Sequence, residues 1–310
     1  MKYALINGIL LDGTEAMQPR PGLSILVNGD RIEALVPAGD EGAGYEKIDL
    51  SGGYVMPGLI NLHVHLPASG RPTVKQKDTK KIVRLMTSNA LLRAITFRVC
   101  AGYAKTELLS GVTTLRSVGG IQAVDSYLRD KILSGKAVGP RILAGNMAVS
   151  VPGGHMAGSL PYAMFDRSVT GASETEQYNG KLVMDGIIAC AKACLKNGIP
   201  VGLGTDTGCP YITHYDMWRE VYYFHKFCGV TNAFALHRAT LGNARLVGLG
   251  EETGSLEPGK CADLVVTGEN PLEDLKALRH MDLVMARGNL YRSPKVKKME
   301  KAERELDKFL

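Results

Sequence analysis

The stretch Met56-Pro-Gly-Leu-Ile-Asn-Leu-His63-Val64-His65 decides how the middle of the chain folds. An apolar run that follows Pro57-Gly58 and ends in two histidines predicts a strand. Residues i and i+2 of a strand face the same side, so His63 and His65 present two imidazoles together at the strand's carboxyl end. Neutral imidazole is the commonest metal ligand in proteins, which favours a metal site. Two ordinary histidines at a strand end are the alternative.

A second motif, Gly202-Leu-Gly-Thr-Asp206-Thr-Gly208, predicts a short strand that ends in a carboxylate between small residues. If the motif lies at the mouth of a barrel, Asp206 can bind a metal and move protons. An Asx turn or a helix N-cap is the alternative for the same residue.

Strand and helix patterns alternate through the middle of the chain, which predicts a mostly parallel sheet with active residues at the carboxyl ends of its strands. The expected strands are Tyr54–His65, Val112–Val118, Arg141–Ala144, Leu160–Phe165 and Pro200–Thr205. The expected helices span 78–110, 121–134, 182–197, 214–228 and 232–247.

Both ends of the chain have a different texture, with short apolar runs separated by turns such as Asn28-Gly29. They form either two small β modules or, as we expect, one composite β-sandwich from 1–55 and 254–292. The last stretch, 293–310, sets Glu300, Glu303 and Glu305 among lysines. This pattern predicts a solvated, charged helical tail.

The composition is that of a globular protein: 45% of the 310 residues are hydrophobic and 22% are charged. The net charge of +6 comes without a basic stripe that includes aromatic residues, so no nucleic-acid partner is expected. No apolar run approaches 18 residues, so no membrane span is expected. The six cysteines lack CxxC spacing, which favours a reducing, cytoplasmic location. P-loop, GxGxxG and GxSxG patterns are missing, which disfavours nucleotide binding and covalent serine hydrolysis.

The chain resembles the amidohydrolase superfamily, most closely its imidazolonepropionase and metal-dependent Xaa-Pro dipeptidase relatives. Residues 57–65 resemble the first-strand signature, and Gly204-Thr-Asp206 resembles the eighth-strand motif. Further stretches that carry the resemblance are 111–120 for the second strand, 139–143 with Gly153-Gly-His155 for the third strand and its loop, and 239–244 and 254–266 for the return to the small β domain.

The resemblance implies a TIM-like (β/α) barrel with a composite β-sandwich. It also implies a one- or two-metal site, usually zinc, that hydrolyses an amide or ring C–N bond. His63 and His65 would be metal ligands, and Asp206 would be the ligand that takes a proton from water. His155 would face the substrate, or it would merely cap its glycine-rich loop. The substrate would be a small amide, a dipeptide or a cyclic amide.

Part of the family pattern is missing from the sequence: a fourth-strand Lys and one His from each of the fifth and sixth strands. Only 141 residues separate His65 from Asp206, whereas seven βα steps need about 175 at the leanest density. We therefore expect an incomplete α/β barrel over 56–253, with about five of eight strands. His214 is expected at the surface or as a helix cap, although it could face the mouth of the barrel.

Two interpretations follow for the whole chain. In the first, His63, His65 and Asp206 hold one zinc ion with water in the fourth position, and Asp206 serves as base and then as acid. In the second, the chain is a catalytically impaired remnant or a binding protein. The missing strands would leave two sheet edges open, which favours a homo-oligomer.

Overall fold

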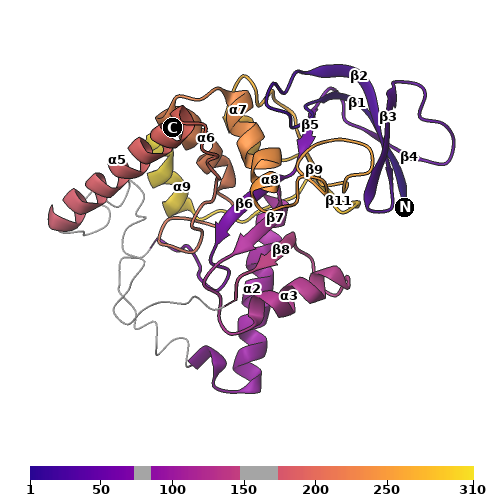
Figure 1. The fold of residues 1–310 in the computed structure, drawn as a ribbon. Coiled ribbons are helices and arrows are strands. Elements are labelled where there is room, and N and C mark those ends of the chain that lie inside the picture. The colour runs from indigo at the N-terminus through magenta and orange to yellow at the C-terminus, as the bar shows by residue number, and fades with distance from the viewer. Residues whose placement is uncertain (73–84, 147–173) are drawn as a thin grey trace.

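The computed structural model describes residues 1–72, 85–146 and 174–310 (Figure 1). His155 and the expected strand Leu160–Phe165 lie outside the described residues, so both stay predictions. In the described part of the chain, no helix is long and apolar enough to cross a bilayer.

Strands from both ends of the chain share one eight-stranded sheet, in the order β11-β10-β9-β5-β1-β2-β3, with β4 paired to β1. Its strands are β1 (Lys2–Leu10), β2 (Arg20–Asn28), β3 (Arg31–Pro37), β4 (Glu46–Asp49), β5 (Tyr54–Pro57), β9 (Leu264–Thr267), β10 (Leu283–Ala286) and β11 (Asn289–Arg292). The two ends meet where β5 runs antiparallel to β9, with Val55 opposite Val266. Both side chains belong to one buried apolar cluster, which gives a physical reason for the pairing.

A second, parallel sheet carries residues 59–64, the part of the stretch Met56–His65 that leads to the two histidines. It consists of β6 (Leu59–Val64), β7 (Val112–Ser117) and β8 (Arg141–Ala144), in that order. The crossovers contain α2 (Ala90–Leu109) and α3 (Val124–Leu133), which lie together below the sheet in Figure 1. Parallel strands joined by helices agree with the alternation in the sequence.

The expected strand at 200–205 differs in a way that matters for the site. Residues 201–207 run beside β6 and parallel to it, but the ladder is reduced to an isolated bridge between Val64 and Thr207. Side chains accept two of the segment's backbone donors: the amide N–H of Leu203 donates to Asn243, and that of Thr205 donates to Asn61. This segment therefore extends the parallel sheet without being a regular strand.

The helices depart most from the expected boundaries in three places, one of which is a helix that begins at Glu174 and not at Leu182. The remaining ones are α5 (Glu174–Lys196), α6 (Met217–Cys228), α7 (Asn232–His237), the π-helical turn η2 (Arg238–Gly242), α8 (Asn243–Leu246), η3 (Leu275–Arg279), α9 (Glu300–Leu306) and η4 (Asp307–Phe309). The helix expected over 232–247 is divided by η2, and α2 begins at Ala90, where the side chain of Asn89 accepts the N–H of Leu92.

The prediction of a solvated C-terminal helix is wrong. The Glu303 side chain is almost fully buried and accepts hydrogen bonds from Arg219 and Arg279. Asp307 accepts from the same two arginines. Arg219 is itself buried, so the carboxylates of the tail turn inward to compensate its charge.

Candidate functional site

His63, His65 and Asp206 meet at the carboxyl end of β6. The Nε2 atom of His65 lies 2.9 Å from Oδ1 of Asp206, and Nε2 of His63 lies 3.4 Å from the same oxygen. One ligand atom from each residue falls within 4.8 Å of the others, and within the described ranges this is the one such group of three metal-ligating side chains. The structure thus brings together the three residues that the sequence singled out.

Two glycines let the segment with Asp206 approach β6 closely. A Cβ atom at position 204 would lie 2.7 Å from the backbone nitrogen of His63, and one at position 208 would lie 2.9 Å from the carbonyl oxygen of His65. Neither distance is possible for a real side chain. Asp206 itself has a φ of +59°, a conformation that is uncommon outside glycine. The small residues around Asp206 in the sequence are therefore required by the geometry of the site.

The environment sets the protonation states of His63 and of Cys209, which lies beside Asp206. Burial, the largest cause, lowers the pKa of His63, so its ring stays neutral and keeps a lone pair for a ligand. Burial and the charge of Asp206 raise the pKa of Cys209 to about 12. The Cys209 thiol is therefore protonated and donates to Oδ2 of Asp206 over 3.6 Å. Because Cys209 contacts Oδ2, the other oxygen of Asp206, Oδ1, is the one that faces His63 and His65.

The donors fit a divalent cation. His65 is 8% exposed, and its Nε2 has no hydrogen-bond partner among the described residues although Asp206 is close. A buried nitrogen without a partner costs free energy, and a cation would remove that cost. Two imidazoles and one carboxylate with an open position are an ordinary catalytic zinc set, and Mn, Fe and Co accept the same donors.

The prediction that His214 lies at the surface or caps a helix is wrong. Its side chain is 2% exposed, and Nδ1 lies 3.2 Å from Oε1 of Glu107, on α2. Its Nε2 lies 2.8 Å from the carbonyl oxygen of Ala68, and its ring stacks on Tyr103. Sequence reasoning missed Glu107 entirely, since nothing in the helical pattern distinguishes an acid whose partner lies 107 residues away.

Ser117, at the carboxyl end of β7, contacts an acid from the helix that follows. Its hydroxyl donates to Oδ2 of Asp125 over 2.9 Å, and both residues are buried. Burial raises the pKa of Asp125, the largest of several effects, and the charge of His65 acts against it. The carboxyl group of Asp125, from α3, is therefore close enough to His65 to interact with it electrostatically.

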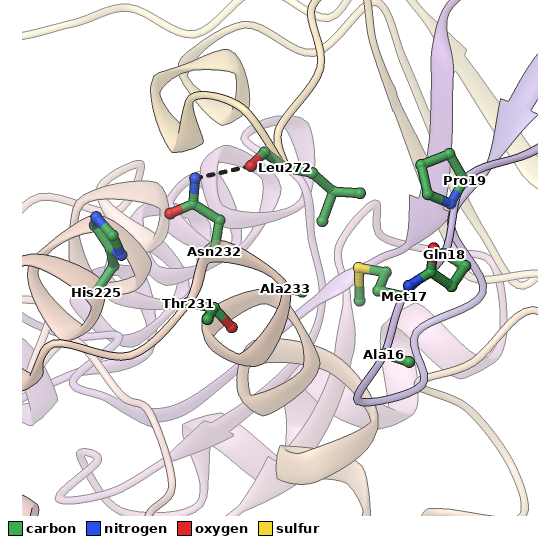
Figure 2. A pocket seen from close by; sticks show the side chains of 9 residues that line it. All are labelled: Ala16, Met17, Gln18, Pro19, His225, Thr231, Asn232, Ala233 and Leu272. Carbon is green, nitrogen blue, oxygen red and sulfur yellow. Dashed lines mark hydrogen bonds between the residues drawn. The ribbon is translucent and has the colours of Figure 1, made fainter.

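A surface pocket of about 340 Å³ lies apart from this group, between the loop after β1 and the junction of α6 and α7 (Figure 2). His225 lines it, and its Nδ1 is 2.7 Å from the carbonyl oxygen of Val230. Asn232 donates to the carbonyl oxygen of Leu272 across the pocket wall. Because His225 is the one metal-ligating side chain in the lining, the pocket does not replace the missing ligands.

Comparison with known sequences finds one family model and several relatives, and all of them are amidohydrolases or imidazolonepropionases. The model of the amidohydrolase family matches residues 181–291. Imidazolonepropionase from Thermoplasma acidophilum is 22% identical over an alignment of 365 residues, which covers 86% of this chain and 88% of the relative. The chain has 310 residues, so at least 55 positions of that alignment have no residue of this chain opposite them.

Solved structures show the same fold. A Bifidobacterium longum protein assigned as a prolidase is 25% identical, with a TM-score of 0.84 over 99% of this chain and 98% of that one. A Xaa-Pro dipeptidase with methionine in its active site is 20% identical, with a TM-score of 0.77 over 94% and 100% of the two chains. The family match, the relatives and the convergence of two strand-end histidines with a strand-end aspartate agree: the chain belongs to the amidohydrolase superfamily.

Proposed function

We propose that this protein is a metal-dependent hydrolase that cleaves a C–N bond in a small amide, a dipeptide or a cyclic amide. The observation that carries the proposal is the approach of two imidazoles and a carboxylate within 4.8 Å at the end of β6. Its membership of the amidohydrolase superfamily points to the same class of reaction. The relatives described as imidazolonepropionase and Xaa-Pro dipeptidase suggest which amides to test first.

His63, His65 and Asp206 would hold the cation, and zinc suits the donors best because three protein ligands leave one position open. The chemistry that such a cation supplies is polarisation of the carbonyl group and acidification of water. Asp206 accepts the proton of the attacking water and then delivers it to the leaving nitrogen. The hydrogen bond from Cys209 to Oδ2 orients Asp206 for this transfer.

The substrate would be held by cationic or polar groups near this edge of the sheet. Nε of Arg116, on β7, donates to the carbonyl oxygen of Leu62 over 2.8 Å, and that carbonyl belongs to the peptide that precedes His63. The guanidinium group is otherwise exposed and acts electrostatically on His63. We propose that it binds a carboxylate of the substrate, and that His155 contributes a second polar contact.

We further propose that the barrel has fewer βα units than those of the relatives. Three strands and the segment 201–207 form the parallel part of the described chain. In the alignment with the Thermoplasma acidophilum relative, the positions without a residue of this chain agree with a shortened barrel. A catalytically impaired family member is therefore the second candidate. β8 has no further strand partner within 1–72, 85–146 and 174–310, and such an edge favours a homo-oligomer.

The deciding experiment measures the metal content and mass of the main size-exclusion peak. We expect about one equivalent of zinc, lost in the double variant His63→Ala/His65→Ala and kept in the control variant His225→Ala. A screen of Xaa-Pro dipeptides and imidazolone-type rings follows on the metal-loaded protein. A folded peak without metal would overturn the proposal in favour of the impaired member, and a strictly monomeric peak would contradict the homo-oligomer.

A further inference from the structure

A buried acid–base pair, Glu107 and His214, is hydrogen-bonded to residues near the candidate ligands in the sequence and the fold. Glu107 is 1% exposed and His214 is 2% exposed, and Oε1 of Glu107 lies 3.2 Å from Nδ1 of His214. Burying two ionisable groups is costly unless each is satisfied. The burial of this pair therefore calls for a physical explanation.

The hydrogen bonds fix the orientation of the His214 ring. A carbonyl oxygen only accepts, so Nε2 of His214 must carry the hydrogen that it shares with Ala68 O, 2.8 Å away. Nδ1 then either donates to an ionised Glu107 or accepts from a protonated one, and both arrangements use both ring nitrogens. Stacking on Tyr103, with the centroids 4.4 Å apart, fixes the plane of the ring.

One end of this network reaches the segment that follows His65. The amide N–H of Ala68 donates to the carbonyl oxygen of His65 over 3.0 Å, which closes a tight turn just after the ligand. His214 holds the carbonyl group of the same residue, Ala68. The turn that follows His65 is thus tied to α2 through Glu107.

The other end reaches the residue before Asp206. Nδ2 of Asn61 lies 3.4 Å from Oε2 of Glu107 and donates to Oγ1 of Thr205 over 2.9 Å, while Oδ1 of Asn61 accepts the amide N–H of Thr205. Thr205 directly precedes Asp206. A single buried carboxyl group, that of Glu107, is therefore connected by side chains to both segments that carry candidate ligands.

We infer that Glu107 and His214 are positioning residues, which set the spacing of His65 and Asp206 and so the affinity of the site for a divalent cation. The inference rests on the proposed function, because it concerns the same site. Groups that orient metal ligands typically change metal affinity by about 10–100-fold when they are removed. A purely structural pair would lower stability and leave the affinity of the folded protein unchanged.

The test compares Zn²⁺ dissociation constants, measured by competition with a chromogenic chelator, for the folded full-length protein and its variants. His214→Phe keeps the stacking on Tyr103 and removes both hydrogen bonds. We expect its Kd to rise about 10–100-fold. Glu107→Gln can still accept from Asn61 and donate to His214, so its Kd should stay near that of the wild type.

His237→Phe is the matched control, because His237 is also buried and makes a hydrogen bond over 2.9 Å to the carbonyl oxygen of Gly13. It should lose stability without losing affinity. If His214→Phe does not fold, His214→Phe/Glu107→Leu removes both partners and avoids an unpaired buried charge, and the same rise in Kd is expected.

The outcomes separate the two claims. Wild-type affinity in folded His214→Phe, or an equal loss in His237→Phe, would overturn the positioning role and leave the proposed function standing. A wild-type protein that binds no Zn²⁺ would overturn the proposed function, and the positioning role with it.

Discussion

Nε2 of His65 and Oδ1 of Asp206 lie 2.9 Å apart, although β6 and the segment with Asp206 are separated by more than 130 residues of chain. The contact depends on parallel alignment: the amide N–H of His65 donates to the carbonyl oxygen of Thr207, and that of Asp206 donates to the carbonyl oxygen of His63. Two backbone hydrogen bonds thus place a carboxylate against a pair of imidazoles.

Gly204→Ala tests how closely that segment must approach β6. The added methyl would lie 2.7 Å from the backbone nitrogen of His63, so the segment must move away. We expect a loss of about 1–3 kcal/mol in the free energy of unfolding and a weaker Zn²⁺ affinity. Urea titration and chelator competition measure the two effects.

Gly186→Ala is the control for this substitution. Gly186 lies in α5, and a Cβ there meets nothing within 4 Å. Alanine should stabilise the helix by up to about 1 kcal/mol and leave the affinity for Zn²⁺ unchanged. Equal behaviour of the two variants would show that the backbone at 204 tolerates a side chain.

Arg219→Met tests the ionic contacts of the C-terminal tail. Removing the guanidinium leaves the buried Asp216 and Glu303 with fewer partners, which should cost about 3–5 kcal/mol of stability. Arg129→Met removes an exposed pair with Asp130 and should cost at most about 1 kcal/mol. Similar midpoints for both variants in urea would support a solvated tail after all.

The rate of cysteine alkylation at pH 8 tests the environment of Cys209 beside Asp206, and the measurement requires no bound metal. The thiolate is the reactive form, and the pKa of about 12 leaves Cys209 almost wholly protonated. Burial raises the pKa of Cys100 to about 12 as well. Mass spectrometry of iodoacetamide-treated protein should find Cys190, which is exposed, modified well before Cys209 and Cys100. Rapid modification of Cys209 would contradict the hydrogen bond to Asp206.

The candidate ligands could be predicted from the sequence because each signal is local. A period of two places His63 and His65 on one face, and an apolar strand that ends in Asp206 between glycines places a carboxylate at the same edge of the sheet. Neither inference requires knowledge of a distant partner. The expected parallel arrangement then follows from the alternation of strands and helices.

The remaining features depend on contacts between distant residues. His214 can be buried because its two ring nitrogens form hydrogen bonds with Glu107 and with the carbonyl oxygen of Ala68. Arg219 holds the tail against the protein through hydrogen bonds to Glu303 and Asp307, which are 84 and 88 residues away in the sequence. The segment 201–207 is no regular strand because Asn61 and Asn243 replace ladder hydrogen bonds with side-chain ones. Hydrophobic periodicity contains none of this information, since each case is decided by a few polar contacts between residues far apart in the sequence.

Glu220→Gln tests a pH dependence that originates next to the site. Burial raises the pKa of Glu220 from 4.5 to about 7, while the amide N–H of Gly204, which hydrogen-bonds to its carboxyl group, acts in the opposite direction. The folded state therefore holds this proton more tightly than the unfolded state. As the pH rises from about 4.5 to 7, the carboxylate forms in a half-buried place and the free energy of unfolding falls. Glutamine mimics the protonated form, so the variant should match the wild type at pH 4.5 and exceed its stability by about 1–2 kcal/mol at pH 8.

Urea unfolding at both pH values measures this difference in stability, with the exposed Glu251→Gln as control. A stability difference that does not change with pH would show that Glu220 ionises normally in the folded protein.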